Sequence, residues 1–170
     1  MCIHTQSYPY LINMVKSAYP VSPLLGNKQF KICIDFLDHE SFALPVVEFC
    51  NYVHVNQINW MQCSWENDLL PLNYDTTILP HYIFSTMFLR YYFPACLNLT
   101  IKYFLGDYCK EGVGNVDSFV EHTIDSIIDH YDKLDMNERE LMYELLKLIE
   151  NNPFYDYKDE CIKLRKVVVG

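Results

Sequence analysis

Two consecutive stretches near the C-terminal end repeat apolar residues at the spacing of an α-helix. In residues 117–132 the repeating side chains are Val120, Ile124, Ile127, Ile128 and Tyr131. In the next stretch, LDMNERELMYELLKLIENN, they are Leu141, Leu145, Leu148 and Ile149. Such spacing gathers the apolar side chains on one face, which a helix must bury against another element. The C-terminal part of the chain is therefore predicted to be a bundle of amphipathic helices.

The ends of these helices carry capping signals. Asn115 or Asp117 is the expected N-cap of the first helix. Asp135, with Glu138 three residues later, has the arrangement of a capping box for the second. A final helix is predicted over about 155–166. Because the connections are short, we expect the three helices to pack antiparallel to one another.

The N-terminal third gives weaker signals. Prolines at both ends limit an early helix to about residues 10–18. QFKICIDF, at 29–36, alternates apolar and polar side chains, which suits a short strand. Residues 45–56 fit either a helix or a strand. One or two short strands in this third of the chain therefore stay open beside the helical interpretation.

The most hydrophobic stretch covers residues 78–105. A helix is predicted from about residue 75 to 92 and a second one up to about 106. Between them Pro94 lacks an amide donor and crowds the preceding turn, so we expect a kink or a break there. Charged residues and proline interrupt the stretch, which favours a pair of buried helices over a membrane span.

Composition agrees with a single mainly α domain. The chain has 170 residues, of which 51% are hydrophobic, so a sizeable core can form. Only 5 residues are glycine, which argues against an all-β design with many tight turns. We expect one domain over residues 1–170, with a helical core at 75–166 and a less regular N-terminal part at 1–60.

The acidic residues of the 117–132 stretch recur every fourth position, with one more just beyond the last repeat: Asp117, Glu121, Asp125, Asp129 and Asp132. On a helix they form an acidic face opposite the apolar one. Like charges four residues apart destabilise a helix by a few tenths of a kcal/mol per pair, roughly. The face is either an ordinary solvated surface or a surface that binds positively charged groups. In the second case it would bind a basic protein partner, or it would mimic nucleic acid and bind a basic nuclease.

The charge of the whole chain points the same way. The formal net charge is −9, and it is uneven: residues 1–106 carry 7 acidic and 5 basic side chains, and residues 107–170 carry 15 and 8. Recognition of a nucleic-acid backbone needs Lys and Arg, so direct binding of nucleic acid is not expected. An acidic surface instead speeds association with a basic partner.

The search for chemistry yields no catalytic motif, metal site or cofactor site. The residues that could form a metal site are His122, Asp125, Asp129 and His130. Its histidines lack the Glu-x-x-His spacing of helical di-metal sites, and solvated helix residues are the simpler interpretation. Thiol–imidazole pairs, Cys109 with His122 or Cys50 with His54, stay open because sequence does not place them in space. We expect a protein that is not an enzyme.

The cysteines and the N-terminus bear on location. Seven widely spaced cysteines without a Cys-x-x-Cys pair are typical of reduced thiols rather than a disulfide framework. The opening residues, MCIHTQSYPY, lack the basic and apolar regions of a secretory signal. A cytoplasmic protein without membrane insertion is the expectation.

Two patterns resemble a known class of proteins. WENDLLPLN is followed by an aromatic-Leu-Arg-Tyr-Tyr-x-Pro-Ala stretch, and a later helix reads LDMNERE and then LLKLIENNP. Together, over about residues 60–155, they resemble small bacterial immunity proteins of the contact-dependent growth inhibition type. The resemblance implies binding of a cognate toxin's C-terminal domain, occlusion of the toxin's active site and no catalytic residue. It assigns no contact residue.

One rival interpretation comes from another class. The high content of Tyr, Asn and Ile also suits a viral helical modulator of host signalling or apoptosis. Such a protein would hold a partner helix in a hydrophobic groove, and its binding would depend little on salt. The acidic face favours the immunity interpretation, in which Asp117, Glu121, Asp125, Asp129 and Asp132 contact the partner.

Overall fold

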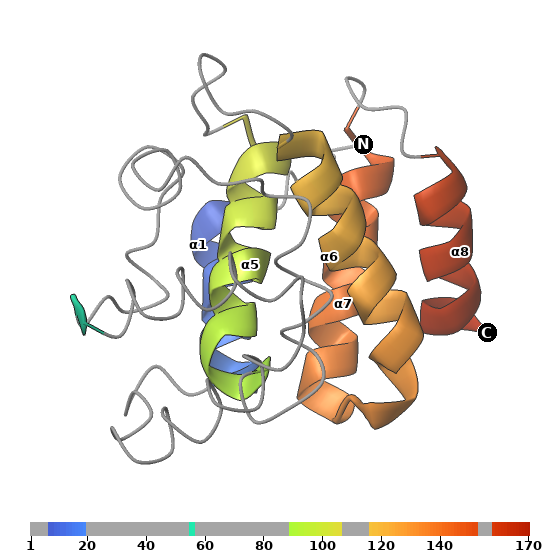
Figure 1. The fold of residues 1–170 in the computed structure, drawn as a ribbon. Helices are drawn as coiled ribbons and strands as arrows, with labels where there is room; N and C mark the ends of the chain where they lie inside the picture. Colours follow the sequence, from blue (N-terminus) through green and yellow to red (C-terminus); the bar gives the residue numbers. More distant parts are fainter. Residues whose placement is uncertain (1–6, 20–54, 57–88, 107–115, 153–157) are drawn as a thin grey trace, which may run out of the picture.

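The computed structural model describes residues 7–19, 55–56, 89–106, 116–152 and 158–170. These residues form five α-helices and one 3-10 helix: α1 (Tyr8–Ala18), α5 (Leu89–Phe104), α6 (Val116–His130), η4 (Tyr131–Lys133), α7 (Met136–Glu150) and α8 (Lys158–Val169). Figure 1 shows the α-helices packed side by side as a bundle. The predicted mainly α class is confirmed, and no strand occurs among the residues just named.

The last three helices alternate in direction, as the short connections predicted. In Figure 1, α6 runs down the page, α7 returns upward and α8 runs down again to the C-terminus. α8 packs against both α6 and α7, while α5 lies against α1, α6 and α7. Asn152, just after α7, donates a 2.6 Å hydrogen bond to the carbonyl of Phe104. The C-terminal ends of α5 and α7 therefore lie together.

α1 packs against α5 and α7, two helices that are distant from it in the sequence. The Tyr8 hydroxyl donates a 2.8 Å hydrogen bond to Oδ1 of the buried Asn98. At the other end of α1, the rings of Tyr19 and Phe93 meet edge to face, with centroids 5.9 Å apart. α1 begins at residue 8, two residues before the predicted start, because Pro9 occupies the first turn, where a missing amide donor costs little.

α5 corrects the expectation at Pro94. The sequence predicted a kink or a break, and the helix is continuous from Leu89 to Phe104 with the proline inside it, so the break into two helices is wrong. Proline within a helix costs about 3 kcal/mol. Every residue from 93 to 101 is buried, and each large apolar side chain contributes about 1.5–3 kcal/mol on burial. Tertiary packing therefore outweighs the local penalty.

α7 follows its sequence signals closely. The Glu138 amide donates to the Asp135 side chain at 2.9 Å, and the Asp135 amide donates to the Glu138 carboxylate at 2.7 Å. The predicted capping box is confirmed. The four residues of its predicted apolar face are buried as well: Leu141, Leu145, Leu148 and Ile149. Met142 and Leu146 are buried with them. This face packs against α1, α5 and α8.

Two helix boundaries differ from the predicted ones. α8 (Lys158–Val169) ends three residues later than the predicted 155–166, and its predicted start at 155 lies outside the described residues. α6 begins at Val116, so Asp117 lies in its first turn and is not its N-cap. The other predicted cap, Asn115, lies outside the described residues. So do the predicted strand at 29–36, the open segment at 45–54 and the predicted helix from 75 to 88.

Candidate functional site

The buried face of α6 fixes which side of the helix is turned outward. Val120, Ile124 and Ile127 are fully buried where α6 packs against α5 and α8. Ile128 and Tyr131, predicted on the same face, are half-buried. Two small polar residues that the apolar pattern did not include, Thr123 and Ser126, are buried beside them. The core face of α6 is therefore wider than the predicted stripe.

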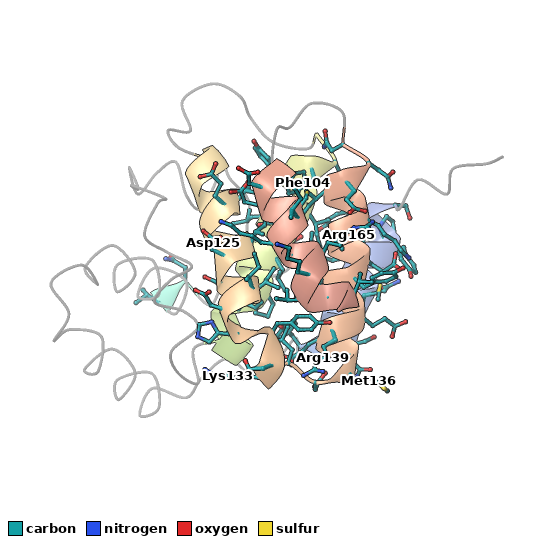
Figure 2. All side chains as sticks on the ribbon, turned by 90° about the vertical axis from the view of Figure 1, so that its right-hand side faces the viewer. Phe104, Asp125, Lys133, Met136, Arg139 and Arg165 are labelled. Carbon is teal, nitrogen blue, oxygen red and sulfur yellow. The ribbon has the colours of Figure 1, made fainter. Side chains whose placement is uncertain are left out.

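The predicted acidic residues lie away from this face. Glu121 and Asp129 are exposed, Asp125 is half-buried, and Asp132 is exposed within η4. Figure 2 places Asp125 on α6 at one edge of the bundle. Asp117 lies in the first turn of the helix, and its side chain is outside the described part of the structure. We call the described set of Glu121, Asp125, Asp129 and Asp132 the acidic face.

The acidic face is a band that winds around the helix. Residues four apart differ by about 40° in direction, because an α-helix turns by about 100° per residue. From Glu121 to Asp129 the band therefore turns through about 80°. Asp132 extends it past the end of α6 into the turn that leads to α7. The acidic face therefore runs along α6 from Glu121 and around one end of the bundle.

The carboxylates of Asp125, Asp129 and Asp132 form no ion pair with a described residue. Both ion pairs found in the described part of the chain involve α7: Lys147 with Glu144 at 2.6 Å, and Arg165 of α8 with Glu150 at 2.8 Å. Arg139 reaches Asp132, but its Nη2 donates to the backbone carbonyl at 3.1 Å. These three carboxylates therefore have no cationic group of a described residue within ion-pair distance.

The position of Asp129 is also unfavourable for the helix itself. It occupies the last turn of α6, next to His130. The C-terminal end of a helix carries partial negative charge, so an acid there costs roughly 0.3–1 kcal/mol. Asp125, one turn earlier, adds like-charge repulsion. The second half of α6 therefore holds acidic side chains that its own stability does not favour.

The described residues offer little to a metal ion. They contain no group of three or more His, Cys, Asp and Glu side chains that could hold one. Nδ1 of His130 lies 3.1 Å from the Ser126 carbonyl, four residues back on the same helix. The side chain of His122, the other histidine of the considered metal set, lies outside the described part.

The described thiols are Cys96 and Cys161. Cys96 is buried, and Cys161 is half-buried. Burial, with smaller contributions from Glu150 and Glu160, raises the pKa of the Cys161 thiol to about 11. A nucleophilic cysteine requires a lowered pKa, so this environment opposes thiol catalysis at Cys161. The cysteines of the two considered thiol–imidazole pairs, Cys50 and Cys109, lie outside the described residues.

One residue near the acidic face received no role from the sequence. Arg139, exposed on the first turn of α7, turns back toward η4 and contacts its backbone and the Tyr131 ring. Figure 2 shows Arg139 at the end of the bundle where Lys133 and Met136 also lie. Its acceptors are backbone carbonyls, which every residue carries, so the residue types in sequence gave no signal for this contact.

Neither the length and hydropathy of the helices nor comparison with known proteins narrows the function. None of the helices in the described ranges is both long enough and apolar enough to cross a membrane. The chain matches no protein-family model, no curated protein and no solved structure.

Proposed function

We propose that this protein is an immunity protein that binds a basic bacterial toxin domain and covers its active site with the acidic face of α6. The supporting observation is that Asp129 and Asp132 are exposed, Asp125 is half-buried, and none of the three has an ion pair with a described residue. Local rules that favour stability are most often broken where a protein has a functional surface. The resemblance of residues 60–155 to immunity proteins supports the same proposal.

The mechanism is electrostatic competition. A toxin that acts on nucleic acid holds phosphates with Lys and Arg, and a helix carrying carboxylates at regular spacing presents an alternative set of anions to them. Complementary charge raises association rates by about 10–1,000-fold at low ionic strength. Binding needs no catalytic residue in the immunity protein.

The direct test is to search the neighbouring genes for a toxin and to co-express this protein with the C-terminal domain of any toxin found there. We expect co-expression to rescue growth and the purified proteins to form a complex. Continued killing despite good expression of both chains would contradict the proposal. Binding that persists unchanged between low and high salt would instead favour the groove-binding host modulator, because binding of an apolar helix is little screened.

The surface is tested by reversing charge on α6. The double variant Glu121→Lys, Asp125→Lys should associate with the toxin domain about tenfold more slowly than the wild-type protein at low salt. This difference in association rate should shrink as salt screens the charges. The matched control is Glu140→Lys with Asp159→Lys, which changes the net charge equally at exposed positions on α7 and α8. Equal slowing by both pairs would show that net charge, rather than this face, governs binding.

A further inference from the structure

We propose that Arg139 is a positioning residue that holds the corner between α6 and α7 and thereby fixes the end of the acidic face that carries Asp132. Arg139 itself does not contact the partner in this proposal. The inference rests on the proposed function for its binding consequence, while its structural part stands on the contacts of the corner alone.

The guanidinium of Arg139 makes three contacts at once. Its Nε donates to the Leu134 carbonyl at 2.9 Å, and its Nη2 donates to the Asp132 carbonyl at 3.1 Å. The same group lies over the Tyr131 ring, 5.2 Å from the centroid. The rigid, forked geometry of arginine allows this combination, which the single ammonium of lysine does not reproduce.

These contacts join three elements. Tyr131 and Asp132 belong to η4, and Arg139 belongs to α7. The Tyr131 hydroxyl donates to the Val168 carbonyl near the end of α8, at 3.4 Å. The adjacent capping box closes the other side of the corner through Asp135 and Glu138. The turn is therefore held by side chains from both sides and does not depend on backbone turn bonds alone.

The choice of acceptors explains how the corner can be both rigid and acidic. The guanidinium of Arg139 reaches Asp132 but donates to its backbone carbonyl, and Asp132 stays exposed. An ion pair would have neutralised the Asp132 carboxylate. Bonding the backbone instead fixes where Asp132 stands and leaves its charge for a partner. Holding a charged group in place before binding lowers the ordering cost of association.

The structural part is tested by amide hydrogen exchange on the isolated protein. The Leu134 amide donates to the Tyr131 carbonyl, and the Asp135 amide donates to Glu138. In Arg139→Lys and Arg139→Met, exchange at these two amides should be about tenfold faster, while exchange in the core of α7 stays unchanged. Unchanged protection at both amides would overturn the proposal, whatever the partner.

The binding part is tested by association and dissociation kinetics with the toxin domain identified in the co-expression test. Arg139→Met makes the protein more negative, so a pure charge effect predicts faster association and slower dissociation. Positioning predicts dissociation about tenfold faster in spite of the added negative charge. Arg139→Lys keeps the charge, so its association rate should stay at the wild-type value while its dissociation also accelerates.

A matched control separates positioning from general loss of stability. Arg165→Lys weakens another arginine contact, the paired hydrogen bonds to Glu150 at 2.8 and 3.1 Å between α7 and α8. We expect it to leave dissociation unchanged. Equal acceleration by Arg165→Lys, or slower dissociation of Arg139→Met, would overturn the positioning role. If the wild-type protein fails to bind the toxin domain, the proposed function falls, and hydrogen exchange still decides whether Arg139 holds the corner.

Discussion

α6 and α7 have the same length and follow one another in the chain, yet they are stabilised in different ways. α7 begins with a complete capping box and carries side-chain ion pairs through Glu144 and Glu150. α6 repeats acids every fourth residue and has one in its last turn. Both bury a broad apolar face. The apolar face is thus common to the two helices, and the local electrostatics are not.

The two helices obtain their stability from different interactions. Two local interactions support α7, the capping box at its start, in which the cap is worth about 1 kcal/mol, and the ion pair of Lys147 with Glu144 within the helix. In the second half of α6 the like charges and the acid in the last turn oppose the helix, so burial of Ile124 and Ile127 has to stabilise it. In a helix with only a structural role, side-chain charges and apolar pattern are expected to favour the same structure. On its solvent side α6 departs from this expectation.

The largest expected effect comes from truncating the core of either helix. Ile124→Ala and Leu145→Ala should each lower the free energy of unfolding by about 2–5 kcal/mol, because both side chains are almost completely buried. The comparison predicts a further difference, measured by amide exchange. Local opening of α6 in Ile124→Ala should increase more than local opening of α7 in Leu145→Ala. Equal increases would show that α6 has local support equal to that of α7.

A smaller effect is expected at the start of α7. Asp135→Ala removes the side chain that accepts from the Glu138 amide and should destabilise the protein by about 1 kcal/mol in urea unfolding. Asp135→Asn keeps an acceptor oxygen at this position and serves as the control, with only a minor loss. If alanine and asparagine are equally tolerated, the capping box is not what distinguishes α7 from α6.

Sequence predicted much of this comparison because its signals are local. The capping residues of α7 and the apolar repeats of both helices can be read from short spacings, and the structure confirms them. The acidic residues fall on the outer side of α6 for the same reason. Helical periodicity assigns a residue to the core or the solvent side without knowledge of its neighbours.

What sequence missed depends on contacts between distant residues. Pro94 signalled a break, but burial of the surrounding turns keeps α5 continuous. Thr123 and Ser126 are polar by residue type, yet packing against α5 and α8 buries them. Arg139 binds backbone carbonyls that no residue type encodes. In each case tertiary structure overrides or adds to a local preference.

The smallest expected effect is also the one that most directly separates stability from function. Asp129→Asn removes an acid from the last turn of α6 and one like-charge neighbour of Asp125, so it should raise the free energy of unfolding by about 0.5 kcal/mol. The same change should slow association with the toxin domain at low salt, less than the double reversal at Glu121 and Asp125 does. Glu140→Gln, at an exposed position of α7, is the neutralising control and should change neither quantity appreciably. If the helix gains stability as it loses binding, its acidic residues serve the partner and not the fold. A loss of stability in Asp129→Asn would mean that Asp129 supports the fold, and the contrast between α6 and α7 would fail.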